Sequence, residues 1–265
     1  MNIVIISDFT SRELFIVEKI IAEYPSAVVV QPVSGLQKTE NKSNKKHSLK
    51  QFINRITWKI HRLLWDRKFY PDKNFPEIKN NLFIPFSILN RPEGIRIFSD
   101  LAPDVIITCR APLLCKDLIQ IPEIAAVNIH FGLSPNYRGN DTLFWPLYYK
   151  DYSHLGGCIH HITPGIDTGN ILAEVYPPLG AYDGEIAVDY NTTVLLAEAA
   201  VQYLKATERA GTRLPGKPQK EKGRNFNLSD RSFGKSLSYL MKRSVGLSLP
   251  PKRQGKIVTH FMPSD

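Results

Sequence analysis

Short apolar segments alternate with helical patterns along the first 150 residues, and this alternation restricts the fold more than any other feature of the chain. The segments are NIVIIS, AVVVQPV, NLFIPF, DVIITC and IAAVNIH, and helical patterns follow at 11–23, 91–101, 114–120 and 141–150. Strands that alternate with helices form parallel sheets covered on both faces. The pattern therefore predicts an α/β fold with a Rossmann-like, mostly parallel twisted sheet.

The second half of the chain follows a different order. GGCIHHI and GNILAEVYPPL come without a helix between them and predict an antiparallel pair, and a long helix is expected over about 185–206. We therefore expect one domain over 1–206, with a basic insertion at about 37–73, and a linker and small basic C-terminal appendage over 207–265. Neither a G-x-G-x-x-G nor a P-loop motif occurs, so the sheet carries no dinucleotide signature.

The net charge of +9 is concentrated in two segments. Residues 38–73 contain 11 Lys and Arg against 3 acids, residues 205–265 contain 14 against 4, and the remainder contains 9 against 18. Basic segments beside an acidic body commonly meet phosphate on a nucleotide, a nucleic acid or a lipid head group. Solvated faces that promote solubility are an equally good interpretation.

Residues 49–65 match a basic amphipathic helix. Its apolar side chains share one stripe, and they are Leu49, Phe52, Ile53, Ile56, Ile60, Leu63 and Leu64. With two tryptophans in the same segment, such a helix suits peripheral contact with a membrane surface. Coverage of the core or a homodimer contact is the favoured alternative.

The chain lacks the features of a secreted or membrane-spanning protein. Its three cysteines are odd in number and form no C-x-x-C pair, and no apolar run approaches about 18 residues. The opening MNIVIISDFTS matches a first strand better than a leader peptide. A cytoplasmic location is expected.

The stretch NIHFGLSPNYRG, residues 128–139, places polar groups where a strand ends. Asn128 and His130 are two positions apart on an apolar strand, so both side chains project from the same face beside the following loop. Ligands of open α/β sheets bind at such ends. Taken alone, such a pair more often caps the strand as satisfied polar groups.

A second polar cluster, HHITPGIDTGNIL, contains Asp167 in a glycine-flanked turn between the two late strands. A carboxylate in a turn is ordinarily a turn residue. Together, VNIHFGLSPNYRG and GCIHHITPGIDTGNIL resemble the folate-dependent formyltransferase superfamily, which includes the sugar N-formyltransferases, methionyl-tRNA formyltransferase and glycinamide ribonucleotide formyltransferase. The family pattern is Asn-x-His-x-Ser-Leu-Leu-Pro-x-Tyr-Arg-Gly with a later Asp-Thr-Gly turn, and the resemblance extends over residues 1–205 in element order.

The resemblance implies roles for particular positions. It identifies Asn128, His130 and Asp167 as the catalytic trio, and CRAPLL with the TPGID turn as the loops that hold the pterin of 10-formyltetrahydrofolate. The expected folate contacts are Arg110, Ala111, Leu113, Leu114, Gly165 and Ile166. The expected substrate contacts are Ser134, Tyr137, Arg138 and His160. The family's Ser and second Leu are Gly132 and Ser134 here, which puts the substrate contacts of that loop in doubt.

These residue types suit formyl transfer from a folate nitrogen to a primary amine. The reaction passes through a tetrahedral carbon bearing an oxyanion, which an amide N–H can stabilise by about 3 to 4 kcal/mol. The imidazole of His130 can take the proton of the amine, and the carboxylate of Asp167 favours its charged form. No metal is expected, because the His160-His161 pair has no credible third and fourth ligand.

The acceptor amine is open among the family's branches. A nucleotide-linked amino sugar, as used in cell-surface glycan synthesis, is favoured because GRNFNLSDRS is similar to the segment that follows the core of sugar N-formyltransferases. The case for methionyl-tRNA as the acceptor is weakened because only about 60 residues follow the core. Other nucleic-acid partners are not expected. Glycinamide ribonucleotide, and a non-catalytic binding module of the same fold, complete the alternatives.

Overall fold

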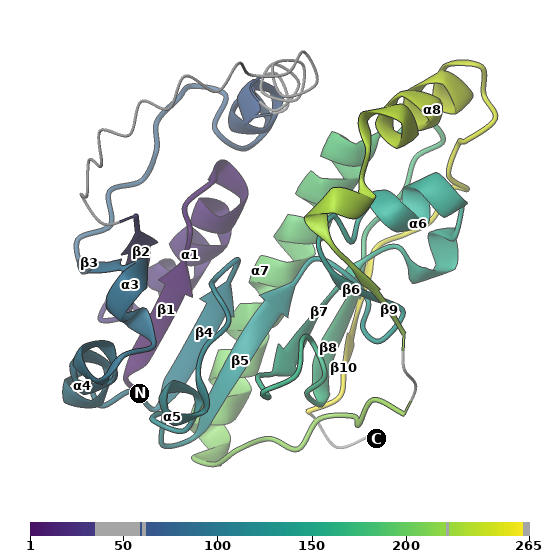
Figure 1. The fold of residues 1–265 in the computed structure, drawn as a ribbon. Helices are drawn as coiled ribbons and strands as arrows, with labels where there is room; N and C mark the ends of the chain where they lie inside the picture. Colours follow the sequence, from purple (N-terminus) through teal and green to yellow (C-terminus); the bar gives the residue numbers. More distant parts are fainter. Residues whose placement is uncertain (35–58, 60–61, 221–222, 262–265) are drawn as a thin grey trace.

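An eight-stranded sheet forms the centre of the computed structural model, which describes residues 1–34, 59, 62–220 and 223–261 (Figure 1). Its order is β10-β8-β7-β5-β4-β1-β2-β3. The strands are β1 (Ile3–Ser7), β2 (Val28–Val33), β3 (Asn81–Pro85), β4 (Val105–Cys109), β5 (Ala125–His130), β7 (Gly157–His161), β8 (Ile171–Tyr176) and β10 (Lys256–Thr259). β1 to β5 pair in parallel, whereas β7, β8 and β10 pair antiparallel to their neighbours. The predicted α/β sheet is confirmed.

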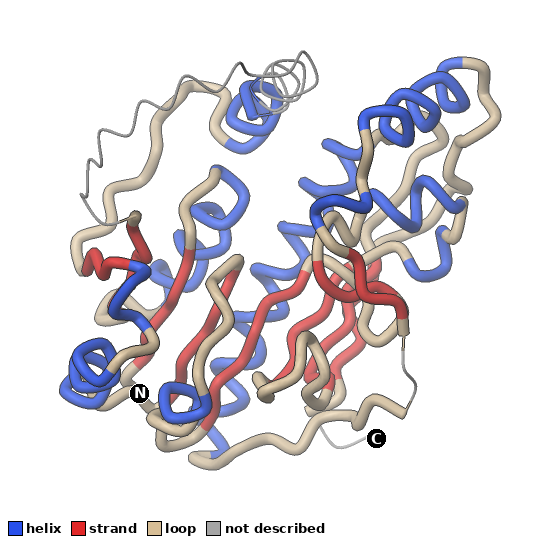
Figure 2. Tube along the Cα trace, in the orientation of Figure 1, coloured by secondary structure: helices blue, strands red, loops and turns tan. Residues whose placement is uncertain are grey.

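Helices cover both faces of this sheet (Figure 2). One face is covered by α1 (Ser11–Glu23) and the long α7 (Glu185–Ala210). The other face is covered by α3 (Phe86–Leu89), α4 (Pro92–Asp100) and α5 (Lys116–Ile119). Two further helices, α6 (Phe144–Tyr149) and α8 (Phe233–Ser244), pack against each other beyond β5, and short 3-10 turns lie at Tyr152–His154 and Leu228–Asp230.

The alternation of side chains along each strand fills two cores. On β1, Ile3 and Ile5 pack with α1 and α7, whereas Val4 and Ile6 pack under α4. All four side chains are at most 2% exposed. A strand buried on both faces needs apolar residues at every position, which explains the continuous runs in the sequence.

The C-terminal segment returns to the core and adds strands to it. β9 (Arg224–Phe226) pairs in parallel with β6 (Tyr137–Gly139), and β10 extends the main sheet beside β8. Phe261 is 6% exposed, with its ring 5.7 Å from that of Tyr203 on α7. Residues beyond α7 thus contribute to the sheet and to its core.

Most of the expected amphipathic helix at 49–65 lies outside the described residues. From residue 62 the chain is helical to 69, and the leucines at 63 and 64 are exposed. No helix within the described ranges is both long and apolar enough to cross a bilayer.

Candidate active site

Three polar side chains lie side by side across neighbouring strands. Thr108 on β4 is paired with Asn128 on β5, and Asn128 is paired with His160 on β7. Directly paired residues of neighbouring strands project from the same face of a sheet. The face is that of Ala126, which packs in the core beneath α4 and α5. The sheet register therefore builds a polar row at the end of β5.

Asn128 is held at both ends of its carboxamide. Its Oδ1 accepts from Thr108 Oγ1 at 2.7 Å, and its Nδ2 lies 3.2 Å from His160 Nε2 and 3.5 Å from Asp167 Oδ1. Because His160 Nδ1 donates to the backbone carbonyl of His161 at 2.8 Å, its Nε2 accepts from Asn128 when the ring is neutral. These contacts fix the direction of the Asn128 N–H groups.

His130 has one ring nitrogen engaged and one beside a carboxylate. Its Nε2 donates to the backbone carbonyl of Tyr137 at 3.0 Å, and its Nδ1 lies 3.7 Å from Asp167 Oδ2, too far for a direct hydrogen bond. The neutral ring therefore carries its proton on Nε2 and its lone pair on Nδ1. Burial lowers the pKa of His130 below its usual value, although the charge of Asp167 opposes that shift. A neutral His130 is ready to accept a proton at Nδ1.

Asp167 is brought to the site by a turn with left-handed backbone at this residue, φ 50°. Its Oδ2 accepts from the backbone N–H of Gly139 at 3.0 Å, and its Oδ1 lies 3.3 Å from His160 Nε2. Burial alone would raise the pKa of Asp167, but the neighbouring histidines and the Gly139 N–H outweigh it and lower that pKa. The carboxylate therefore remains charged beside His130.

Two contacts around the trio of Asn128, His130 and Asp167 were not predicted from the sequence. Thr108 orients Asn128, and Gln219 Nε2 donates to the carbonyls of Asp167 at 2.9 Å and Gly169 at 2.7 Å. A polar residue within the apolar run DVIITC was the available signal for Thr108. Gln219 lies in the C-terminal segment, and no local pattern pointed to it.

Gly132, where the resembled family has Ser, lies against His130. A Cβ at this position would stand 2.5 Å from the carbonyl oxygen of Tyr137 and 2.7 Å from His130 Nε2. The loop of this chain therefore packs its backbone directly over the imidazole. The departure from the family pattern is thus a close contact with His130.

Gly132→Ser should displace the Tyr137 carbonyl and free the Nε2 of His130. We expect kcat to fall about tenfold or more and the free energy of unfolding to fall by about 1 to 3 kcal/mol, as for other overpacked sites. Turnover and thermal melting measure the two effects. Gly234→Ser is the matched control, since an added Cβ there meets nothing nearer than 3.9 Å. Unchanged turnover in Gly132→Ser would contradict the role of this contact.

The residues expected to hold the pterin lie in the loop after β4 and in the turn before β8, which also carries Asp167. In the loop after β4, Arg110 has left-handed backbone, φ 54°, and its Nε lies 3.7 Å from Asp8, while Leu113 is 70% exposed. Ala111 and Leu114 pack partly against the core beneath α4. In the turn before β8, Gly165 is exposed and Ile166 is 42% exposed. Exposed apolar side chains in both loops suit a flat heteroaromatic ligand.

The four expected substrate contacts are placed differently from one another. Ser134 and Tyr137 are 2% and 3% exposed, and Tyr137 donates its hydroxyl to Asp151 at 2.9 Å and stacks on Phe226. These two side chains support the loop from within. Arg138 is half-buried and donates to the carbonyl of Gly223 at 3.2 Å. His160 lies in the polar row.

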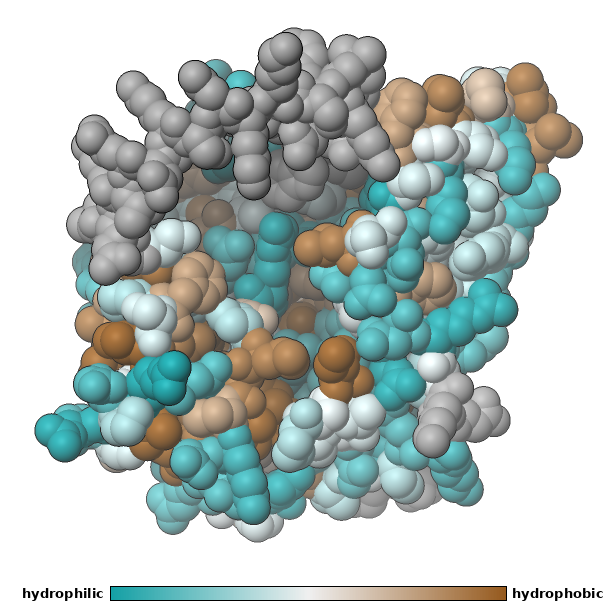
Figure 3. Space-filling model, in the orientation of Figure 1, coloured by the Kyte–Doolittle hydropathy of each residue, from teal (hydrophilic) through white to brown (hydrophobic). Residues whose placement is uncertain are grey.

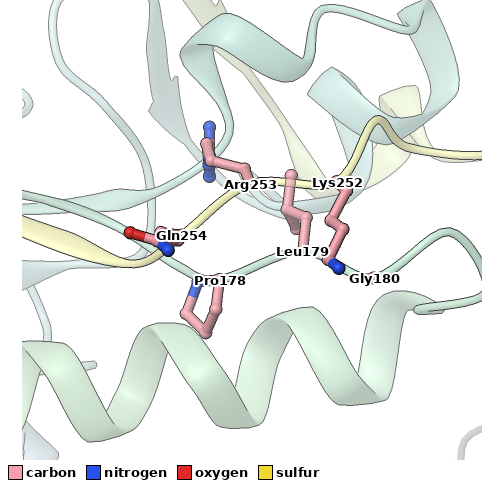
Figure 4. Close-up of a pocket in the computed structure, with 6 residues that line it drawn as sticks. All are labelled: Pro178, Leu179, Gly180, Lys252, Arg253 and Gln254. Carbon is pink, nitrogen blue, oxygen red and sulfur yellow. The ribbon is translucent and has the colours of Figure 1, made fainter.

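The molecular surface is hollowed on the face that these loops border, with hydrophilic and hydrophobic residues on the walls (Figure 3). A separate pocket is lined by Pro178, Leu179, Gly180, Lys252, Arg253 and Gln254 (Figure 4). It follows β8 at the end opposite the Asp167 turn. The guanidinium of Arg253 donates to three backbone carbonyls, those of Tyr152, Leu155 and Pro177. The lining of this pocket includes no member of the trio.

Comparison with known proteins finds similarity to formyltransferases. The Formyl transferase family profile matches residues 71–202. The methionyl-tRNA formyltransferase of Clostridium acetobutylicum is 32% identical over 98 residues, which are 36% of this chain and 31% of that protein. The chain thus matches about a third of the length of this curated relative.

Solved structures share the fold at low identity. A likely sugar N-formyltransferase from Mycobacterium tuberculosis has a TM-score of 0.59 and 15% identity, with 100% of this chain and 99% of that chain covered. The formyltransferase PseJ from Anoxybacillus kamchatkensis, solved with UDP-4,6-dideoxy-4-formamido-L-AltNAc and tetrahydrofolate, has a TM-score of 0.50 and 17% identity. The superposition covers 94% of this chain and 95% of the PseJ chain.

Proposed function

We propose that this chain, which belongs to the formyl transferase family, moves a formyl group from 10-formyltetrahydrofolate to a primary amine. The observation that carries the proposal is the convergence of the trio. Asn128 Nδ2 lies 3.5 Å from Asp167, and Asp167 lies 3.7 Å from His130 Nδ1, although the three residues are spread over 40 positions from 128 to 167. The comparisons support the reaction class.

Each member of the trio has a role that its geometry supports. The acceptor amine attacks the formyl carbon, and Asn128 Nδ2 donates to the oxyanion that forms there. Nδ1 of His130 accepts the amine proton, and the charged Asp167 stabilises the resulting imidazolium. The carbon–nitrogen bond to the folate then breaks, and the proton passes to the departing folate nitrogen. Charge is balanced at each step.

The proposed acceptor is the amino group of a nucleotide-linked sugar. The match to the M. tuberculosis structure, which covers 100% of this chain and 99% of that chain, supports this branch. β9 supports it as well, because it brings Arg224 next to β6, whose Gly139 binds Asp167. A cation at this place suits a diphosphate. Methionyl-tRNA and glycinamide ribonucleotide are the competing acceptors.

Supplying the purified protein with 10-formyltetrahydrofolate and a panel of UDP- and dTDP-linked amino sugars tests the proposal. We expect release of tetrahydrofolate and a formamido sugar with at least one panel member, and none with Asn128→Ala. Formylation of charged initiator tRNA, but of no nucleotide sugar, would exclude the sugar acceptor and support methionyl-tRNA as the acceptor. Folate-induced thermal stabilisation without turnover of any amine would instead favour a binding module.

A further inference from the structure

Helix α8 turns its apolar side chains towards solvent. Phe233 is 42% exposed, Leu237 44%, Leu240 58% and Met241 57%. Their spacing of four, seven and eight residues places them on one side of the helix, and we call them the apolar stripe. Figure 3 shows hydrophobic surface at the corner that α8 occupies in Figure 1. Val245 and Leu247 continue this surface beyond the helix, at 69% and 62% exposure.

The opposite side of α8 is held by polar contacts to the protein. Lys235 Nζ donates to the carbonyl of Asp230 at 2.8 Å and lies 5.1 Å from the Trp145 ring. The Arg243 guanidinium donates to the carbonyls of Tyr182 and Asp183, and Tyr239 is buried. A surface helix ordinarily buries its apolar side. These inward cations therefore anchor α8 in the orientation that leaves its apolar stripe uncovered.

A second element with the same chemistry lies at the same end of the molecule. The helix over 62–69 exposes Leu63 and Leu64, at 67% and 47%, next to the exposed cations Arg62, Arg67 and Lys68. In Figure 1 this helix and α8 both project at the top of the view, on either side of the strand ends. Two separate segments thus expose leucines and cations at the same end of the molecule.

A second copy of the chain fits this face poorly. The 12 residues of α8 form a rod about 18 Å long and about 10 Å wide, so the stripe projects about 200 Å². A stable protein interface buries about 800 Å² on each partner. The exposed cations Arg62 and Arg67 would also face a second set of cations across such a dimer. An extended surface with negative charge could contact both helices at once, and it would suit both their exposed apolar side chains and their exposed cations.

We propose that the apolar stripe of α8, together with Leu63 and Leu64, docks the protein on the surface of an anionic lipid bilayer. The apolar side chains enter the boundary between head groups and acyl chains, and Arg62 and Arg67 lie among the anionic head groups. Attachment is interfacial, and its strength depends on the apolar area and on the lipid charge.

Flotation of the full chain with vesicles tests the proposal. We expect binding to vesicles of phosphatidylcholine with a quarter phosphatidylglycerol, weaker binding to pure phosphatidylcholine, and weakening with salt. The variant Leu237→Ser/Leu240→Ser/Met241→Ser should lose about tenfold or more in binding. The control is Phe83→Ser/Phe86→Ser, which removes apolar side chains of 59% and 44% exposure on β3 and α3, near the other edge of the sheet.

The outcomes separate a membrane from a second copy. Absence of binding to the charged vesicles, or equal binding by the α8 variant and the Phe83→Ser/Phe86→Ser control, would overturn the proposal. So would a wild-type dimer in light scattering that the α8 variant converts to monomer. Leu240→Glu is a single change at an exposed position, and it should reduce vesicle binding without altering thermal melting. Formyl transfer to soluble acceptors is expected to be unchanged in these variants, so this test is independent of the proposed activity.

Discussion

Asn128→Ala is expected to lower kcat about a hundred- to a thousandfold while KM for the folate changes little. The removed N–H groups act on the oxyanion, which exists only in the transition state, and loss of such a donor costs about 3 to 4 kcal/mol. Asn80→Ala is the matched control, because Asn80 is exposed and its side chain donates to the carbonyl of Pro25 at 3.3 Å. Steady-state kinetics and thermal melting separate loss of turnover from loss of folding.

The double variant Asn128→Ala/His130→Ala tests whether the two side chains act on the same step. If the two side chains act on the same tetrahedral intermediate, the double variant should be much less impaired than the product of the single losses. Thr108 loses its 2.7 Å partner in Asn128→Ala, so a modest fall in stability, about 1 to 2 kcal/mol, is expected there. Turnover close to wild type in both single variants would exclude the proposed mechanism.

Asp167→Asn is expected to lower kcat about a hundredfold or more and to move its pH dependence. In the wild type, burial lowers the pKa of His130, so the rate should fall on acidification only below the usual pKa of histidine, about 6.5. The Asp167 carboxylate raises the pKa of His130 against that effect. Removing the charge should therefore lower the pKa further and shift the acid limb to lower pH.

The pH profile distinguishes an electrostatic role from a structural one. A purely structural role of Asp167 in its turn would reduce kcat at every pH and leave the acid limb in place. The control is Asp72→Asn, at an exposed position outside the sheet, which should alter neither kcat nor the limb. A shift of the limb to higher pH in Asp167→Asn would contradict the assigned sign of the interaction.

Sequence periodicity determined the strands and placed Asn128 and His130 on one face of β5. Apolar runs such as NIVIIS are strands because buried positions on both faces leave no room for polar side chains, and β1 to β5 lie where those runs predicted. Asn128 and His130 share a face because strand side chains repeat every two residues, as the structure confirms for β5. These properties depend on neighbours within a few positions, so the sequence alone contains them.

Pairing across the sheet was decided only by the tertiary structure. Thr108 meets Asn128, and His160 meets it from the other side, because β4, β5 and β7 adopt one particular register. The basic C-terminal segment was expected as an appendage, but in the fold it supplies β9, β10 and the Gln219 contact that holds the Asp167 turn. Such contacts join residues that are distant in the chain, and no local pattern records which partner each segment will meet. The reaction class could thus be inferred from short motifs, whereas the groups that orient the trio required the assembled sheet.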